Sequence, residues 1–192
     1  MKINGRFLIF VLILIGLTTL MKIQFGADMS WSGFSPVIAI ALFSGMIIRQ
    51  KSMSFLLPLI ALLVSDGVIH LLYKAGEFDY PGLYHGQWKV YLILLSATLI
   101  GWLLKARKYG SILAGVIAAP TVFFLISNFA VWMGSEGNLY SKDFNGLINC
   151  YVAAIPFYRN ALISTIVFLP AILFMYNVLV HRKTALLVRY EA

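Results

Sequence analysis

The sequence contains six apolar segments, most of them about as long as the hydrocarbon core of a bilayer is thick. A backbone inside hydrocarbon must pair its own N–H and C=O groups, so apolar segments of this length are expected to form helices. Of the 192 residues, 61% are hydrophobic and 11% are charged, which does not describe a soluble domain. We therefore predict an all-α integral membrane protein that forms one transmembrane domain over 1–192. Its six spans are expected near 7–23, 34–48, 55–73, 90–104, 110–133 and 161–180.

The segment near 34–48 is the least regular of the six. Pro36 and Arg49 limit its length, so it needs a thinned bilayer or an adjusted tilt to cross. We expect a helix here, with less well defined ends than the others.

The segment near 7–23 has an alternative interpretation. It follows Lys2 and Arg6, as the apolar part of a cleavable signal peptide would. No small-x-small cleavage pattern follows it, and Lys22 can extend to the outer surface as at an ordinary helix end. We expect a retained span, and only the mature N-terminal sequence distinguishes the two cases.

Basic residues are distributed unequally between the two sides of a six-span topology. Ten of the 15 fall on the side of the N-terminus, and an excess of Lys and Arg marks cytoplasmic loops. These ten are Lys2, Arg6, Arg49, Lys51, Lys105, Arg107, Lys108, Arg182, Lys183 and Arg189. Both termini are therefore predicted to be cytoplasmic. The net charge of +8 reflects this topology and an attraction to anionic lipid, and it predicts no nucleic-acid partner.

The sequence lacks the common signatures of catalysis and metal binding. Cys150 is the only cysteine, which excludes an intrachain disulfide and an all-cysteine metal site. We find no phosphate-binding Gly-rich loop, no HExxH motif and no GxSxG motif. We predict a protein that is not an enzyme and that has no metal and no cofactor.

Two ionisable residues, Asp66 and His70, lie within the apolar segment near 55–73. A charge near the middle of a bilayer costs at least about 2.5 kcal/mol, so such residues usually face a bundle interior, a wet cavity or a partner. Their spacing of four places both on one helix face. They are the first candidates for contact with a ligand.

Polar and aromatic residues converge at the predicted outer end of the bundle. A rise of about 1.5 Å per residue places Asp66, His70 and Asn128 in the outer half, with Trp132 one turn beyond Asn128. A long outer loop over 134–160 adds further polar groups. The candidate substrate-binding residues are Asp66, His70, Asn128, Trp132, Asn149, Cys150, Tyr151 and Arg159.

Several of these candidates have a structural alternative. Trp132 lies where the aromatic belt of any membrane protein lies, and Asn128 is equally suited to hydrogen bonding another helix. Asp66 and His70 have each other or Arg159 as partners in this alternative. Cys150 is typical of a small buried hydrophobic residue.

Three blocks of the sequence carry a resemblance to a known family. The first block is WSGFSPVIAIALFSG over 31–45, and the second joins Pro58 to Ser65-Asp66. The third contains Phe123-Phe124, Asn128-Phe129, Trp132, Gly146-Leu147, Cys150-Tyr151, Ala153-Ala154, Pro156-Phe157 and Arg159-Asn160. Together they resemble a bacterial family of six-helix membrane proteins of unknown function, described as transport proteins. That family in turn resembles the substrate-binding S components of energy-coupling factor vitamin transporters.

The resemblance implies a multi-pass protein of the bacterial inner membrane with a pocket at its extracellular or periplasmic end. S components dock to a transmembrane coupling subunit through an Ala-x-x-x-Ala pattern on the first helix, whereas Phe7 to Met21 contains no alanine. A solitary S-like protein therefore stands beside one that works with energy-coupling subunits. Some solitary S-like proteins handle cobalamin, and Cys150 or His70 has a side chain that can ligate cobalt.

We hypothesise that the chain takes up a small vitamin or cofactor-like nutrient through this outer pocket. In this hypothesis Arg159 binds a carboxylate or phosphate, Asp66 accepts a hydrogen bond from a ring nitrogen or amine, and Trp132 stacks on the ligand. The alternative is a membrane scaffold of the rod shape-determining type, which has a similar size and helix count and needs no small ligand. A membrane enzyme with His70 and Asp66 as an acid–base pair is a third interpretation, which no nucleophile motif supports.

Overall fold

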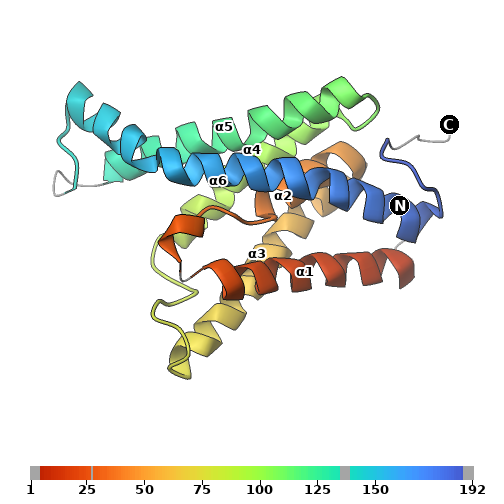
Figure 1. Cartoon of the computed structure of the whole chain (residues 1–192), viewed down its shortest axis with the longest axis horizontal. Helices are drawn as coiled ribbons and strands as arrows, with labels where there is room; N and C mark the ends of the chain where they lie inside the picture. The colour runs from red at the N-terminus through yellow and green to blue at the C-terminus, as the bar shows by residue number, and fades with distance from the viewer. Residues whose placement is uncertain (1–4, 27, 135–138, 188–192) are drawn as a thin grey trace.

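The computed structural model describes residues 5–26, 28–134 and 139–187, and within these ranges it contains helices and loops without strands (Figure 1). The all-α prediction is therefore confirmed for the described residues. Lys2 and Arg189 lie outside them. The elements are α1 (Gly5–Phe25), η1 (Met29–Trp31), α2 (Val37–Ile47), α3 (Lys51–Lys74), α4 (Gln87–Leu104), α5 (Tyr109–Gly134), α6 (Phe144–Tyr176) and the short π-helix η2 (Asn177–His181).

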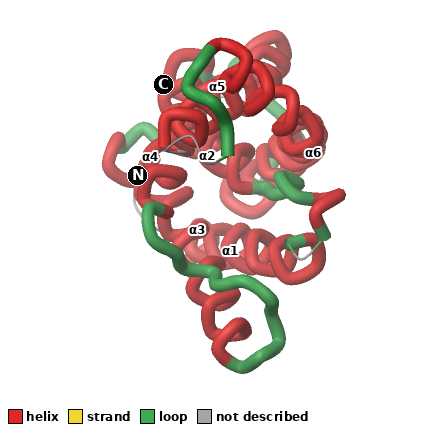
Figure 2. The backbone as a smooth tube through the Cα atoms, turned by 90° about the vertical axis from the view of Figure 1, so that its left-hand side faces the viewer, coloured by secondary structure: helices red, strands yellow, loops and turns green. Residues whose placement is uncertain are grey.

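α2 is the central helix of the bundle, and all eleven of its residues are buried. It contacts α3, α4, α5 and α6. Figure 2 views the molecule end-on, with α1 and α3 on one side, α5 and α6 on the other, and α2 and α4 between them. The approach to α4 is close, because a Cβ atom added at Gly45 would lie 2.0 Å from the carbonyl oxygen of Thr98. An aromatic cluster of Phe10, Phe43 and Tyr176, with ring centroids 5.2–5.4 Å apart, joins α2 to α1 and α6.

The predicted span at 34–48 is corrected to a shorter buried helix. α2 has eleven residues and a length of roughly 16 Å, about half the thickness of a bilayer core. Pro36 is its N-cap, and Ile48 adopts extended backbone at its end. The sequence of this segment was apolar enough to suggest a helix that crosses the membrane, but its apolar residues are explained by the burial of α2 among its neighbouring helices.

The other five helices, α1, α3, α4, α5 and α6, are long and apolar enough to cross a membrane. They carry large apolar side chains on their outer faces, including Leu12, Leu71, Leu103 and Leu113, which are 58–83% exposed. Exposed apolar surface on this scale is unusual in a soluble monomer. These features suggest a multi-pass membrane protein.

α6 replaces much of the loop predicted over 134–160. It begins at Phe144, after the N-cap Asp143, whose side chain accepts a hydrogen bond from the Gly146 N–H at 2.7 Å. Its 33 residues give a length of roughly 50 Å. The predicted span at 161–180 therefore covers only the second half of α6 and η2.

Charge separates the two ends of the bundle. We call one end the basic end, because Arg6, Arg49, Lys51, Lys105, Arg107, Lys108, Arg182 and Lys183 lie there. The other is called the acidic end, because all five described carboxylates lie toward it: Asp28, Asp66, Glu77, Asp79 and Asp143. The side of the membrane that each end faces stays a prediction.

Candidate functional site

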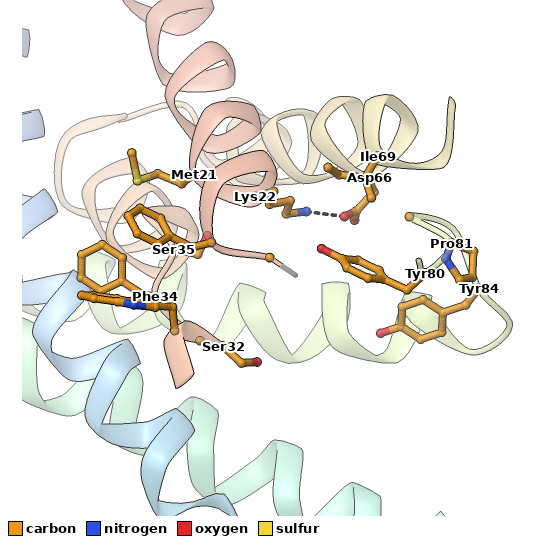
Figure 3. A pocket seen from close by; sticks show the side chains of 15 residues that line it. Met21, Lys22, Ser32, Phe34, Ser35, Asp66, Ile69, Tyr80, Pro81 and Tyr84 are labelled. Carbon is orange, nitrogen blue, oxygen red and sulfur yellow. Dashed lines mark hydrogen bonds and ion pairs between the residues drawn. The ribbon is translucent and has the colours of Figure 1, made fainter. Parts of the chain in front are cut away.

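A cavity of about 470 Å³ opens at the acidic end (Figure 3). The cavity is lined by the end of α1, by the segment that precedes α2, by α3 and by the loop between α3 and α4. The lining residues are Met21, Lys22, Phe25, Gly26, Trp31, Ser32, Gly33, Phe34, Ser35, Asp66, Ile69, Tyr80, Pro81, Gly82 and Tyr84. We call it the acidic-end cavity.

Asp66 is the polar centre of this cavity and is only 7% exposed. Its carboxylate forms an ion pair with Lys22 of α1. It also accepts hydrogen bonds from Gln87 Nε2 at 2.6 Å and from Tyr91 Oη at 2.5 Å. A charge in such a position is tolerated when it is paired and hydrogen-bonded, and Asp66 meets both conditions.

The same network holds the loop between α3 and α4 against the cavity. Gln87 Nε2 also donates to the Gly82 carbonyl at 3.0 Å, and the Tyr84 N–H donates to Gln87 Oε1 at 3.3 Å. Burial raises the pKa of the Tyr80 and Tyr84 phenols, and the nearby Asp66 charge raises it further. Both phenols therefore stay protonated at neutral pH and keep a hydrogen-bond donor.

A second, smaller cavity of about 220 Å³ continues toward α5 and α6. It shares Lys22, Gly33 and Ser35 with the acidic-end cavity. The remaining lining is mostly apolar or aromatic, and Asn128 is a polar exception whose Nδ2 donates to the Phe124 carbonyl at 2.8 Å. We call it the bundle cavity. Lys22 thus lines both cavities.

An aromatic wall borders the acidic-end cavity. The rings of Phe25, Trp31 and Phe34 lie with centroids 5.1–5.6 Å apart. Asn160 of α6 holds this wall in place, because its Nδ2 donates to the carbonyls of Ser30 at 2.8 Å and Ser32 at 2.9 Å. The wall therefore depends on one buried amide from a distant part of the chain.

The structure brings together only part of the predicted site. Asp66 lines the acidic-end cavity and Asn128 lines the bundle cavity. His70 lines neither. The alternative in which it pairs with Asp66 is wrong, because the described partners of Asp66 are Lys22, Gln87 and Tyr91, and the buried His70 Nδ1 has no hydrogen-bond partner within the described ranges. Arg159 is not the partner of Asp66 either, since Lys22 takes that place.

The five remaining candidates line neither of these cavities. Trp132 Nε1 donates to the Ser141 carbonyl at 2.9 Å, and Tyr151 Oη donates to the Leu125 carbonyl at 2.7 Å. The Cys150 thiol is buried and donates to the Asn128 carbonyl at 3.4 Å. Asn149 and Arg159 are exposed on α6. The predicted placement of Asn149, Cys150, Tyr151 and Arg159 in a loop is wrong because α6 begins at Phe144, whereas Trp132 lies on α5.

Sequence reasoning missed Lys22, Gln87, Tyr91 and Asn160. Lys22 was expected to extend to the surface, but its side chain turns inward to Asp66 (Figure 3). Gln87 and Tyr91 are four residues apart at the start of α4, so they lie on one face of the helix. The predicted span began at residue 90 and therefore did not include Gln87. Nothing local marked them as partners of Asp66.

Over the residues that the structure describes, these observations define a helical protein with five helices long and apolar enough to cross a membrane, and with cavities at its acidic end. The chain belongs to a family of unknown function (DUF6580), whose profile matches residues 1–187. The expected membership of an uncharacterised family is confirmed at that level. No curated protein matches the chain, and no solved structure matches it.

Proposed function

We propose that this chain is a multi-pass protein of the bacterial cytoplasmic membrane that binds a small nutrient at its acidic end, as S components do. The observation that carries the proposal is the acidic-end cavity, which is lined by both a partly buried Lys22–Asp66 pair and an aromatic wall. Ligand sites are typically concave and mostly apolar, with a few convergent polar groups. The separation of charge between the two ends supports placing this cavity on the outer side.

The chemistry of the cavity favours a ligand with a flat ring and at least one charged group. Lys22 offers an ammonium to a carboxylate or phosphate, and Asp66 offers oxygen atoms to an amine or a ring N–H. Trp31 and Phe34 offer faces for stacking. The ligand would compete with the internal ion pair for these groups. Lys22 takes the role that the sequence assigned to Arg159, because Arg159 lines neither cavity.

A scaffold function is the second candidate, and one observation favours it. Asp66 already has three donors within the chain, from Lys22, Gln87 and Tyr91. A carboxylate satisfied in this way serves equally well to hold α1, α3 and α4 together. The scaffold interpretation therefore expects no small-molecule ligand.

A ligand screen by thermal unfolding distinguishes the two candidates. The purified protein in detergent is tested against vitamins, nucleobases and cobalamin, because a ligand at 100 times its Kd adds roughly 2.7 kcal/mol to folding stability. We expect a hit whose stabilisation is lost in Ser35→Trp, which fills the junction of both cavities, and kept in Lys74→Gln, an exposed cation at the same end. A well-folded protein that no compound stabilises would favour the scaffold.

A further inference from the structure

A cavity of about 480 Å³ lies at the basic end, remote from the proposed ligand site. The connection from α2 to α3 contributes Arg49, α3 contributes its first residue, Lys51, and the connection from α4 to α5 contributes Lys105 and Arg107. Trp102 and residues 46–48 complete most of the lining. We call it the basic-end cavity. Two segments that are distant in the sequence thus bring four cations to one cavity.

Among the described residues, the charged side chains that line this cavity all have one sign. Four of its nine lining residues are Lys or Arg. The five carboxylates of the described ranges lie toward the acidic end, and Glu136 and Glu191 lie outside those ranges. A concave site lined by several cations concentrates a positive electrostatic field and therefore attracts an anion.

The cavity is also held in a defined shape. The Lys51 ammonium lies 5.6 Å from the centroid of the Trp102 ring, which packs against Phe55 with centroids 4.7 Å apart. Trp102 Nε1 donates to Ser54 Oγ at 3.1 Å, which fixes the indole. Lys105 adopts a left-handed backbone with φ of 49°, a conformation that glycine enters more easily. A lysine at such a position suggests a use for its ammonium group.

Apolar surface adjoins the cations. Residues 46–48, at the end of α2, are only 1–3% exposed and give the cavity an apolar floor. Leu103, next to Trp102 on α4, is 83% exposed, so the surface beside the cavity is apolar as well. A cationic rim over apolar surface suits the head group and adjoining chains of an anionic amphiphile. Basic pockets of this kind between membrane helices bind acidic lipid head groups.

We propose that the basic-end cavity binds a phosphate group, with Lys51 and Lys105 as its direct ligands. Charge-assisted hydrogen bonds from ammonium groups are well suited to phosphate oxygens. Two sources offer this chemistry: the head group of an anionic phospholipid, and a soluble phosphate. The site is independent of the ligand proposed for the acidic end.

The test compares Lys51→Gln/Lys105→Gln with Arg6→Gln/Lys108→Gln, which removes two cations of the same end that do not line the cavity. Each protein is placed in detergent micelles that contain phosphatidylcholine, with or without phosphatidylglycerol, and retained phosphatidylglycerol is measured by native mass spectrometry. We expect the first variant to retain at least tenfold less phosphatidylglycerol than the wild type, and the second to match the wild type. Lys51→Arg/Lys105→Arg should restore retention, which separates loss of charge from misfolding.

The source of the phosphate is decided in the same system by thermal unfolding. Stabilisation by phosphatidylglycerol but not by inorganic phosphate assigns the site to a lipid head group. Stabilisation by inorganic phosphate alone assigns it to a soluble phosphate. The proposal is overturned if neither phosphatidylglycerol nor inorganic phosphate stabilises the wild type. It is also overturned if Lys51→Gln/Lys105→Gln and Arg6→Gln/Lys108→Gln reduce phosphatidylglycerol retention equally, because the cations would then serve only the orientation of the protein in the membrane.

Discussion

At the scale of single residues, the Lys22–Asp66 pair is the contact that most constrains the acidic end. Removing one partner of a buried pair leaves an uncompensated charge and typically costs about 3–5 kcal/mol. Because Lys22 is 20% and Asp66 10% exposed at the side chain, we expect the lower part of that range. Lys22→Met should therefore destabilise the protein strongly, and Lys22→Met/Asp66→Asn should destabilise it less than the single change. The free energy of unfolding of both variants is measured by adding dodecyl sulfate to the protein in detergent micelles. Lys74→Gln is the control and should leave this free energy unchanged.

Gly82 gives a second prediction at this scale. A Cβ atom there would lie 2.1 Å from the Asp66 carbonyl oxygen and 2.5 Å from the His70 backbone nitrogen. Gly82→Ala must therefore displace the loop that carries Tyr80 and Tyr84, with a cost of roughly 1–3 kcal/mol. Gly67→Ala is the matched control, because a Cβ atom at Gly67 meets nothing within 4 Å. Equal unfolding stability of the two variants would contradict the close packing of this loop.

Some of these residues could be identified from the sequence and others could not. Asp66 and Asn128 were found because a polar residue within an apolar segment is a local signal. Lys22 was misassigned because a cation in the last turn of a helix normally reaches the surface. Its direction here depends on how α1 is rotated against α3, which a single sequence does not specify.

At the scale of elements, the hydrogen bonds that attach η1 to α6 hold the aromatic wall in position. Asn160→Leu removes hydrogen bonds to Ser30 and Ser32, each worth about 1 kcal/mol. We expect faster amide hydrogen exchange across residues 30–35 and a weaker response to any acidic-end ligand. Asn149→Leu, an exposed change on the same helix, should alter neither. Unchanged exchange in Asn160→Leu would mean that η1 is held by other contacts.

The start of α6 gives a prediction about pH. Hydrogen bonds from the Ser141 hydroxyl and the Gly146 N–H lower the pKa of Asp143 below its ordinary value of 3.8. A lowered pKa in the folded state contributes stability above pH 3.8 that is lost as the pH falls through the folded value. The melting temperature of Asp143→Ala should therefore lie below that of the wild type at pH 7, and the gap should narrow in acid. A gap independent of pH would contradict the capping role.

The elements were predictable where apolar character was continuous. The spans expected near 7–23, 55–73, 90–104 and 110–133 correspond to α1, α3, α4 and α5 within a few residues at each end. The first half of α6 was missed because polar residues and Pro156 lower its average hydropathy, although an apolar stripe of Phe144, Ile148, Val152 and Ile155 runs along it. The span predicted at 34–48 was longer than α2, because burial inside a protein and insertion into a membrane select the same apolar residues.

At the scale of the whole molecule, nutrient capture at the acidic end requires a defined orientation in the membrane. The basic end should face the cytoplasm and the acidic end the opposite side. Cysteines introduced singly at Lys108 and Lys74 on a Cys150→Ser background report this directly. We expect a membrane-impermeant maleimide added to intact spheroplasts to label the cysteine at position 74 and spare the one at 108. The reverse pattern would place the acidic-end cavity inside the cell and exclude nutrient capture from outside.

Cavities lie at both ends of the molecule, and we propose a different role for each end. The acidic-end cavity is proposed to recognise a nutrient through Lys22, Asp66 and an aromatic wall. The basic-end cavity is proposed to hold a phosphate through Lys51 and Lys105. The short α2 lies between them, because its N-terminal approach lines the first and its C-terminal end lines the second.

The central claim is that the acidic-end cavity holds a small molecule, and its most direct test is the mass analysis of what the protein carries from its native membrane. Wild-type protein is extracted gently, denatured and analysed by liquid chromatography and mass spectrometry beside Ser35→Trp and Ser35→Ala. We expect one small compound in proportion to the protein in the wild type and in Ser35→Ala, and its absence from Ser35→Trp. The same compound at equal amounts in all three proteins, or none in any, would contradict it.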